Sequence, residues 1–485
     1  MKNRITKDMV YKCVEKDQGL VASDPHRLHY HIMPPVGLLN DPNGFVFFKG
    51  VYHIFYQWNP FAVEHGMKCW GHYISEDLIH WREAPVALLP DKWYDKNGCY
   101  SGSAVVYQEQ LYVFYTGNVK DDEDNRQSYQ CLAISEDGIH FEKKGPIIYV
   151  PDGYTAHFRD PKVFYRGDSW WMVLGAQTEA KKGETVVYQS KDLTTWTFKG
   201  NLIGSGYKGL ENFGYMWECP DMFRLRDKDI LLVCPQGIPA QGISYQNIFQ
   251  SGYFAGEFDN QSMSFHHEKF IELDRGFDFY APQTMQDPKG RRLLFGWMGN
   301  AEEGPTKHPT AKYKWVHALT VPRQLEWKNG KLLQYPVEEF KQLLENEVDF
   351  GEIHLDDELP FPLPNINETA FAMYLSVESI GANYLEMQIG ESHLIYNPAI
   401  NLFTFKRRSF TKPHSVESRH CTVDFLHDIL ILKDTSSMEI FLNQGEEVFT
   451  SRIFEEQETN KIRLQANGKI KVNVKKWNVR RVTEY

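Results

Sequence analysis

Three acidic residues, Asp41, Asp160 and Glu218, share a local setting in the sequence. Both aspartates directly precede a proline, and Glu218 precedes one after a single intervening cysteine. A residue before proline is biased towards extended backbone, and proline cannot donate within a central ladder. We therefore expect the three acids at strand entrances, where their side chains can face a cavity. Carboxylates sharing one cavity push their pKa values apart, which gives a glycosidase one ionised group and one proton donor.

Residues suited to a sugar surround these acids. Aromatic rings offer flat apolar faces with polar edges, and amide, hydroxyl and guanidinium groups can bond hydroxyls. For any single aspartate before proline, a turn-building role is an equally good explanation. Three acids at corresponding places, beside aromatic rings and an arginine, favour a site. The candidates for sugar contact are Trp58, Trp70, Tyr100, Trp217, Phe279, Tyr280 and Trp297, with Asn40, Gln57, Ser101 and Arg159.

A strand-rich unit of about 60 residues is repeated five times. Asp41, Ser101, Asp160, Glu218 and Tyr280 mark the five starts, at successive intervals of 60, 59, 58 and 62 residues. Each unit has room for four strands, and four-stranded units in radial array form a β-propeller. A β-sandwich has no reason to keep this period. Radial repetition would bring the three distant acids to one height around a central funnel.

The remaining chain predicts three further segments. Residues 1–25 are expected to form a helical or irregular lead-in to a propeller over 26–335. Proline followed by apolar residues at helical spacing predicts a linker helix over 336–350. Alternating apolar runs over 351–485 predict a second all-β domain, most simply a β-sandwich. The fold class is therefore all-β, with a five-bladed β-propeller followed by a C-terminal β-sandwich.

Composition excludes several classes of function. The charge of −11, from 53 basic and 64 acidic residues, argues against a nucleic-acid partner. No apolar run of about 18 residues is present, so we expect no membrane span. Seven scattered cysteines and a polar N-terminal segment favour a cytoplasmic location. The histidines show no metal-binding spacing, so we expect no metal, and no cofactor is needed for glycoside hydrolysis.

Several stretches together resemble glycoside hydrolase family 32, and the resemblance extends from about Ser23 to near the C-terminus. It implies that Asp41 is the nucleophile towards a β-D-fructofuranosyl unit, Glu218 the general acid/base and Asp160 the transition-state stabiliser. It also implies sugar contacts for Asn40, Gln57, Trp70, Tyr100, Ser101, Arg159 and Tyr280. The matching stretches are LLNDPNG (38–44), FYQWNP (55–60), CWGHYIS (69–75), YSGSA (100–104), FRDPK (158–162), MWECPD (216–221) and FYAPQ (279–283).

These roles carry electrostatic expectations. Glu218 must hold a proton near neutral pH, so its pKa should be raised by neighbouring carboxylates and partial burial. Asp41 should stay ionised, and Arg159 should keep the adjacent Asp160 charged. One departure from the family is His65, which stands where many members have tryptophan and leaves the contacts to the leaving sugar open.

In their amino-acid sequence, the motifs most resemble those of bacterial sucrose-6-phosphate hydrolases. We therefore expect sucrose 6-phosphate and sucrose as the small-molecule substrates. Open alternatives are an intracellular invertase or β-fructosidase of short fructans, a fructosyltransferase, an inverting propeller glycosidase and a non-catalytic sugar-binding propeller. A homo-oligomer is possible. The candidate cations for binding the phosphate are His65, Lys68, Arg126 and His157. For each of them, a solvated charge on a loop is the simpler interpretation.

Overall fold

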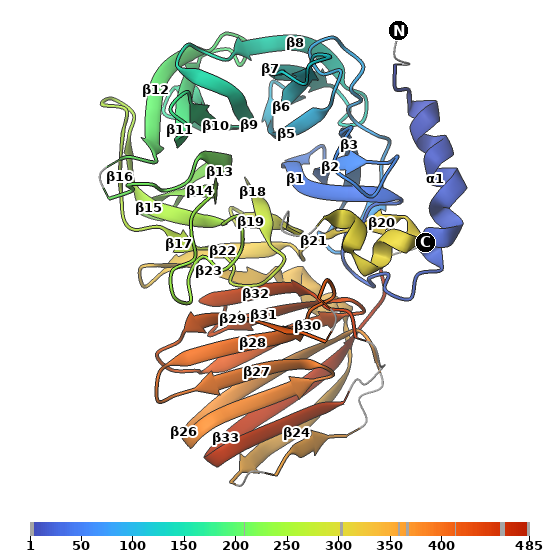
Figure 1. Cartoon of the computed structure of the whole chain (residues 1–485), viewed down its shortest axis with the longest axis vertical. Helices are drawn as coiled ribbons and strands as arrows, with labels where there is room; N and C mark the ends of the chain where they lie inside the picture. Colours follow the sequence, from blue (N-terminus) through green and yellow to red (C-terminus); the bar gives the residue numbers. More distant parts are fainter. Residues whose placement is uncertain are drawn as a thin grey trace.

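The computed structural model describes residues 4–207, 209–300, 304–356, 359–364, 368–412, 414–455 and 461–482. The chain forms a five-bladed β-propeller followed by a β-sandwich, with the long helix α1 (Lys7–Ala22) beside the propeller (Figure 1). Thr6 caps this helix by accepting a hydrogen bond from the backbone N–H of Met9. The all-β architecture expected from the repeat is confirmed.

Each blade is an antiparallel sheet whose first strand contacts the first strands of both neighbouring blades. Blade 1 contains β1 (Gly37–Phe48), β2 (Val51–Asn59), β3 (Cys69–Ser75) and β4 (Arg82–Glu83). Blade 2 contains β5 (Cys99–Tyr107), β6 (Gln110–Lys120), β7 (Arg126–Ser135) and β8 (Glu142–Tyr149). Blade 3 contains β9 (Tyr154–Arg166), β10 (Ser169–Thr178), β11 (Gly183–Ser190) and β12 (Thr197–Gly204). Blade 4 contains β13 (Met216–Leu225), β14 (Lys228–Gln236), β15 (Gly252–Asp259), β16 (Ser264–His267) and β17 (Ile271–Glu272). Blade 5 contains β18 (Tyr280–Gln286), β19 (Arg292–Met298), β22 (Arg323–Lys328) and β23 (Lys331–Pro336).

A short segment closes the ring between blades 5 and 1. Strand β20 (Trp315–Val316) pairs in parallel with the start of β1, and β21 (Ala318–Leu319) pairs with β19. The Trp315 indole is completely buried and donates to Asp24 Oδ2 at 2.7 Å. Backbone pairing of β20 and β21 therefore joins the last blade to the first, and the buried Trp315 fixes this segment to Asp24.

A β-bulge interrupts the first strand of every blade at the repeated marker. The pairing shifts between Leu39 and Pro42, Cys99 and Gly102, Arg159 and Lys162, Glu218 and Asp221, and Tyr280 and Gln283. Bulges bend a strand and re-aim its side chains, often next to active sites. Asp41, Ser101 and Asp160 lie within their bulges, whereas Glu218 and Tyr280 are the last paired residues before theirs. Counted from the last paired residue, the marker therefore lies two residues on in blades 1 and 2, one residue on in blade 3, and at the paired residue itself in blades 4 and 5.

The linker between the two parts is only partly helical. A 3-10 helix covers Glu338–Leu343, and strand β24 starts at Leu344, so the helix predicted over 336–350 is wrong beyond Leu343. From Leu344 onwards the backbone pairs with the last strand of the sandwich, and this pairing overrides the helical spacing. Two further 3-10 helices, Pro305–Lys307 and Pro309–Tyr313, precede β20.

In the sandwich, strand β26 joins two arms of one folded sheet. Its first half pairs with β30, its second half with β27, and its other edge pairs with β33. Both arms contribute to one apolar core. The strands are β24 (Leu344–Leu355), β25 (Phe361–Leu363), β26 (Phe371–Ile389), β27 (Ser392–Asn397), β28 (Leu402–Arg408), β29 (Val416–Thr422), β30 (Asp428–Asp434), β31 (Ser437–Leu442), β32 (Glu447–Arg452) and β33 (Ile462–Val479).

A buried ionic network fastens the propeller to the sandwich. His31 lies 2.8 Å from Asp434 Oδ2 and 2.9 Å from Glu439 Oε1, and the side chains of all three are fully buried. Arg323 donates to Glu439 and to Asp274. Burial alone would lower the pKa of His31, but the two carboxylates outweigh it and raise that pKa.

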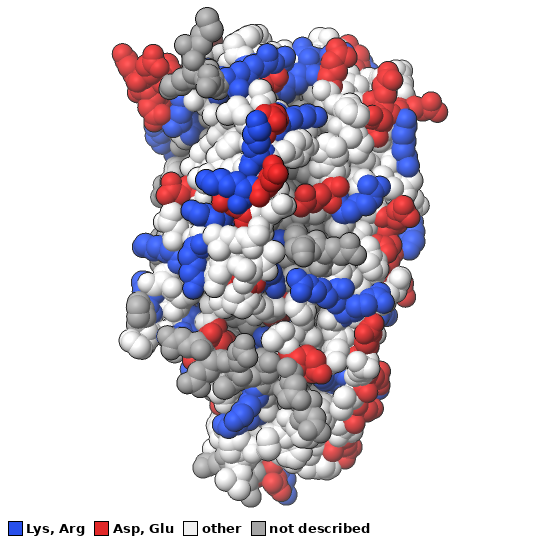
Figure 2. All heavy atoms as spheres, turned by 90° about the vertical axis from the view of Figure 1, so that its right-hand side faces the viewer, with Lys and Arg blue, Asp and Glu red and all other residues white. Residues whose placement is uncertain are grey.

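Charges are mixed on the face of the molecule that carries α1. Acidic and basic side chains are interspersed there and do not gather into one field of a single sign (Figure 2). Among the helices of the described ranges, none is long and apolar enough to cross a membrane.

Candidate active site

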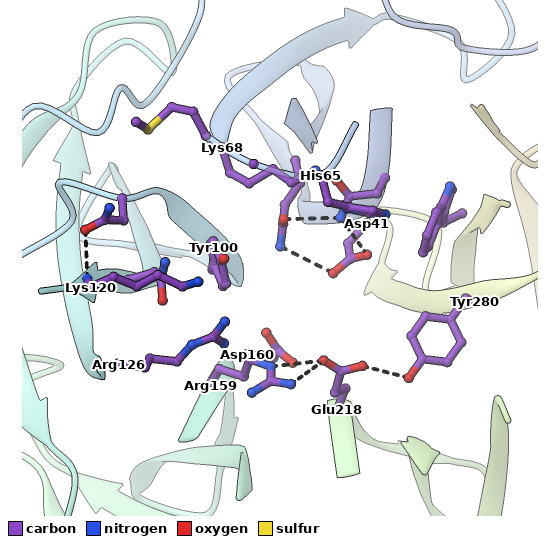
Figure 3. Close-up of a pocket in the computed structure, with 17 residues that line it drawn as sticks. Asp41, His65, Lys68, Tyr100, Lys120, Arg126, Arg159, Asp160, Glu218 and Tyr280 are labelled. Carbon is purple, nitrogen blue, oxygen red and sulfur yellow. Dashed lines mark hydrogen bonds and ion pairs between the residues drawn. The ribbon is translucent and has the colours of Figure 1, made fainter. Parts of the chain in front are cut away.

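The first strands of all five blades contribute to the wall of one cavity of about 590 Å³. This convergence is what the radial repeat predicted, because Asp41, Asp160 and Glu218 come from three different blades and face the same space (Figure 3). Of the predicted sugar-contacting residues, seven line this cavity: Asn40, Gln57, His65, Tyr100, Arg159, Tyr280 and Trp297.

Asp41 is held by uncharged donors from blades 1 and 2. Ser101 Oγ donates to Asp41 Oδ2 at 2.5 Å, and Asn40 Nδ2 donates to Oδ1 at 3.0 Å. Gln57 Nε2 lies 3.4 Å from Oδ2. Burial raises the pKa of Asp41, and the bonds from Ser101 and Asn40 oppose that rise. The carboxylate is therefore fixed in orientation by three neutral side chains.

Lys68 is a buried cation next to this group. Only 3% of Lys68 is exposed, and its ammonium donates to Asn40 Oδ1 at 2.5 Å. An ammonium can only donate, so it selects the amide orientation in which the Asn40 NH₂ group faces Asp41. No carboxylate in the described ranges lies within ion-pair distance of Lys68. Burial lowers its pKa to about 7, against the attraction of Asp41.

Glu218 is the most strongly bonded of the three acids. Arg159 donates to Glu218 Oε1 through Nε at 3.0 Å and Nη2 at 2.6 Å. Tyr280 and Gln236 donate to Oε2 at 2.8 and 2.6 Å. Burial would raise the pKa of Glu218, but the charge of Arg159 and these bonds outweigh it and lower that pKa. The expectation of a raised Glu218 pKa is therefore wrong, and Arg159 pairs with Glu218 instead of keeping the adjacent Asp160 charged.

The pKa of Asp160, like that of Asp41, is raised. Burial, together with the charges of Glu218 and Asp41, raises the pKa of Asp160 to about 7 despite the nearby Arg159. Its backbone lies in the left-handed region at φ 67°, as does Cys219 at φ 48°. The Cys219 N–H donates to Asp160 Oδ2 at 3.0 Å. These two strained residues thus place one backbone donor against the carboxylate, a use of strain typical of functional sites.

Aromatic residues form one side of the cavity. The rings of His65 and Trp297 meet edge-to-face with centroids 6.0 Å apart, and Trp297 meets Tyr280 in the same way at 6.2 Å. The Trp297 indole donates to His317 Nδ1 at 2.9 Å, which fixes its plane. His65 therefore extends an aromatic wall in the place where many family members have tryptophan.

Five of the candidate sugar contacts are buried and do not line the cavity: Trp58, Trp70, Ser101, Trp217 and Phe279. Trp70 is completely buried, and its indole donates to the backbone oxygen of Tyr100 at 3.0 Å. Ser101 is buried, and its hydroxyl donates a hydrogen bond to Asp41. The place of Trp70 and Ser101 in the motif suggested direct contact with a sugar, but the structure gives both of them supporting positions.

Sequence reasoning missed several polar residues of the site, because they stand at the far ends of strands rather than at the repeated marker. Gln236 ends β14 opposite the start of β13, and it reaches Glu218 from there. Of the four cations considered for a phosphate, His65, Lys68 and Arg126 line the cavity, whereas His157 bonds Arg159 Nη1 instead. The missed lining residues are Gly66, Met67, Asn97, Asn118 and Lys120.

Comparison with known proteins agrees with this architecture. The models of the N-terminal and C-terminal domains of glycosyl hydrolases family 32 match residues 31–336 and 339–481. The sucrose-6-phosphate hydrolase of Bacillus subtilis (strain 168) is 46% identical over 472 residues, covering 96% of this chain and 97% of that protein. The β-fructofuranosidase of Bombyx mori is 32% identical with a TM-score of 0.86, covering 99% of both chains. The sucrose-6-phosphate hydrolase of Lactobacillus gasseri is 30% identical with a TM-score of 0.87, covering 99% of this chain and all of that one (100%).

A propeller of this kind with its carboxylate cavity is the catalytic part of a glycoside hydrolase. The chain belongs to glycosyl hydrolase family 32.

Proposed function

We propose that the protein hydrolyses the β-D-fructofuranosyl bond of sucrose 6-phosphate and of sucrose. The main support for the proposal is that Asp41, Asp160 and Glu218 line one cavity, to which all five blades contribute. Relatives named sucrose-6-phosphate hydrolase over nearly the whole chain support the substrate class, as does a Bombyx mori β-fructofuranosidase variant solved with sucrose. Seven free cysteines support a cytoplasmic location.

The reaction is proposed to proceed by two displacements with net retention. An Asp41 oxygen attacks the anomeric carbon of the fructosyl unit while Glu218 gives its proton to the glycosidic oxygen, releasing glucose 6-phosphate or glucose. Glu218 then takes a proton from water, and the resulting hydroxide attacks the same carbon and frees Asp41. Asp160 accepts hydrogen bonds from fructosyl hydroxyls and stabilises the positive charge of the transition state.

The acid role requires the Arg159–Glu218 ion pair to weaken when the sugar enters. In the free site, burial and the charges of Glu218 and Asp41 favour a proton on Asp160, while Arg159 keeps Glu218 ionised. Fructosyl hydroxyls that donate to Asp160 favour its ionised form, so the shared proton moves to Glu218. Proton transfer within the carboxylate set would thus couple sugar binding to activation of the acid.

Steady-state assays of the purified protein on sucrose and sucrose 6-phosphate test this function. We expect fructose release from both substrates, with water as the main acceptor. Binding of both sugars without turnover would indicate a non-catalytic propeller instead. Accumulation of fructosyl oligosaccharides at low sucrose concentration would indicate a fructosyltransferase.

A further inference from the structure

A pair of cations forms the part of the cavity wall that belongs to blade 2. Lys120 is the last residue of β6, Arg126 is the first residue of β7, and the two lie directly opposite each other in the ladder. Both line the cavity. Figure 3 shows the Arg126 side chain reaching into the cavity beside Arg159 and Asp160. Neither cation has a role in the double displacement described above.

Arg126 differs from the other cations of the cavity in its lack of a partner. Arg159 is paired with Glu218, and Lys68 donates to Asn40. The Arg126 guanidinium makes no hydrogen bond or ion pair within the described ranges. It lies 5.8 Å from the centroid of the Tyr100 ring, and burial together with the charges of Arg159 and Arg126 lowers the pKa of the nearby His157 to about 4. An arginine that is half-buried in a cavity without a carboxylate has all its donors available to an anion.

The acidic residues near this pair do not neutralise Arg126. The turn between β6 and β7 (121–125) carries four acids, and Asp124 lies 2.8 Å from the Lys120 ammonium. The Asp124 side chain is 77% exposed, so this ion pair is screened by solvent. No residue of the turn lines the cavity, whose three carboxylates are Asp41, Asp160 and Glu218. Lys120 is therefore a secondary cation and Arg126 the principal one.

The position of the pair assigns it to the leaving sugar. Asp41, with Asn40 and Gln57 from blade 1, defines the place of the fructosyl unit. Glu218 must lie next to the glycosidic oxygen that it protonates, so the leaving hexose extends past Glu218 and Arg159. Arg126 stands on that side, whereas His65 stands against Trp297 on the aromatic wall.

We propose that Arg126, assisted by Lys120, binds the 6-phosphate of the leaving hexose; this inference rests on the proposed function. The planar guanidinium matches two oxygens of a phosphate monoester, and the ammonium adds a point charge. The three carboxylates repel an anion from the part of the cavity that they line. The blade 2 wall therefore both attracts the phosphate and directs it away from the nucleophile.

The test compares Arg126→Gln and Lys120→Gln with the wild type on sucrose 6-phosphate and on sucrose. For Arg126→Gln we expect kcat/KM on sucrose 6-phosphate to fall about 10- to 100-fold, mainly through KM, and kcat/KM on sucrose to stay within about twofold. Lys120→Gln should give a smaller loss with the same selectivity. Inhibition by glucose 6-phosphate should weaken in parallel, while inhibition by glucose should not change.

Lys96→Gln is the matched control, because Lys96 is an exposed lysine of the same region that does not line the cavity. It removes the same charge and should leave the ratio of the two substrates unchanged. Equal losses on both substrates in Arg126→Gln would overturn the assignment, as would a phosphate preference that survives the substitution. A wild type that cleaves neither sugar would overturn the proposed function itself, which distinguishes the two failures.

Discussion

Replacing Lys68 by methionine should lower activity and at the same time leave stability unchanged or increased. The pKa of Lys68 falls from 10.5 to about 7 on burial, so the folded state binds this proton less tightly than the unfolded state. The resulting cost to folding is complete below about pH 7 and shrinks as the pH rises towards 10.5. A lowering of this size corresponds to an upper bound of about 5 kcal/mol on that cost.

Methionine has a similar length and carries no charge, so its burial removes this cost while keeping most of the packing. We expect the free energy of unfolding at pH 6 to rise by about 1–3 kcal/mol, because loss of the bond to Asn40 offsets part of the gain. The advantage should shrink as the pH is raised from 7 towards 10. Urea denaturation at pH 6 and 9 measures both values.

The same substitution should lower kcat/KM on sucrose by about 10- to 100-fold, because one charge-assisted hydrogen bond no longer fixes the Asn40 amide against Asp41. The exposed Lys96→Met variant serves as the control and should change neither quantity. Parallel losses of stability and activity would mean that Lys68 is a structural residue. Unchanged activity in a stabilised variant would mean that it does not position Asn40.

Asp41→Asn should lower kcat by several orders of magnitude with an unchanged circular dichroism spectrum, and activity within about tenfold of the wild type would remove it as the nucleophile. Glu218→Gln should abolish sucrose hydrolysis and spare part of the activity on aryl fructosides, since a phenolate leaves without protonation; equal losses on both would contradict an acid role. In the wild type, kcat/KM should fall above about pH 7 as the carboxylate set loses the proton that Asp160 holds in the free site, and a profile flat to pH 9 would argue against a shared proton. His31→Gln should cost about 3–5 kcal/mol, because it leaves the buried Asp434 without its cation and Glu439 with Arg323 alone. Since the pKa of His31 is raised, that cost should be complete below pH 6.5 and shrink as the pH passes the folded-state value, and a cost independent of pH from 5 to 9 would show that the imidazole is neutral.

The repeated parts of this structure could be predicted from the sequence. Asp41 and Asp160 are predictable because each precedes a proline in a unit of nearly fixed length, and such a unit forms one blade with a bulge at that residue. The convergence of the acids followed from the radial symmetry alone.

Contacts between blades could not be predicted from the sequence. Nothing local to Arg159 shows that its guanidinium turns to Glu218, 59 residues later, rather than to the adjacent Asp160. Likewise, Trp70 sits in a motif of polar and aromatic residues, but its ring packs in the apolar core between blades 1 and 2. The segment after Leu343 has helical spacing, yet its pairing with β33 decides its conformation.

The anomeric outcome of fructosyl transfer to methanol tests the central claim most directly. The wild-type enzyme, acting on sucrose in aqueous methanol, is predicted to form methyl β-D-fructofuranoside, because the two displacements at Asp41 restore the starting configuration. The methyl fructoside does not mutarotate, so NMR of the product reports the stereochemistry of the enzymatic step. Formation of methyl α-D-fructofuranoside would contradict the nucleophilic role of Asp41 and assign the carboxylates to a single, inverting displacement.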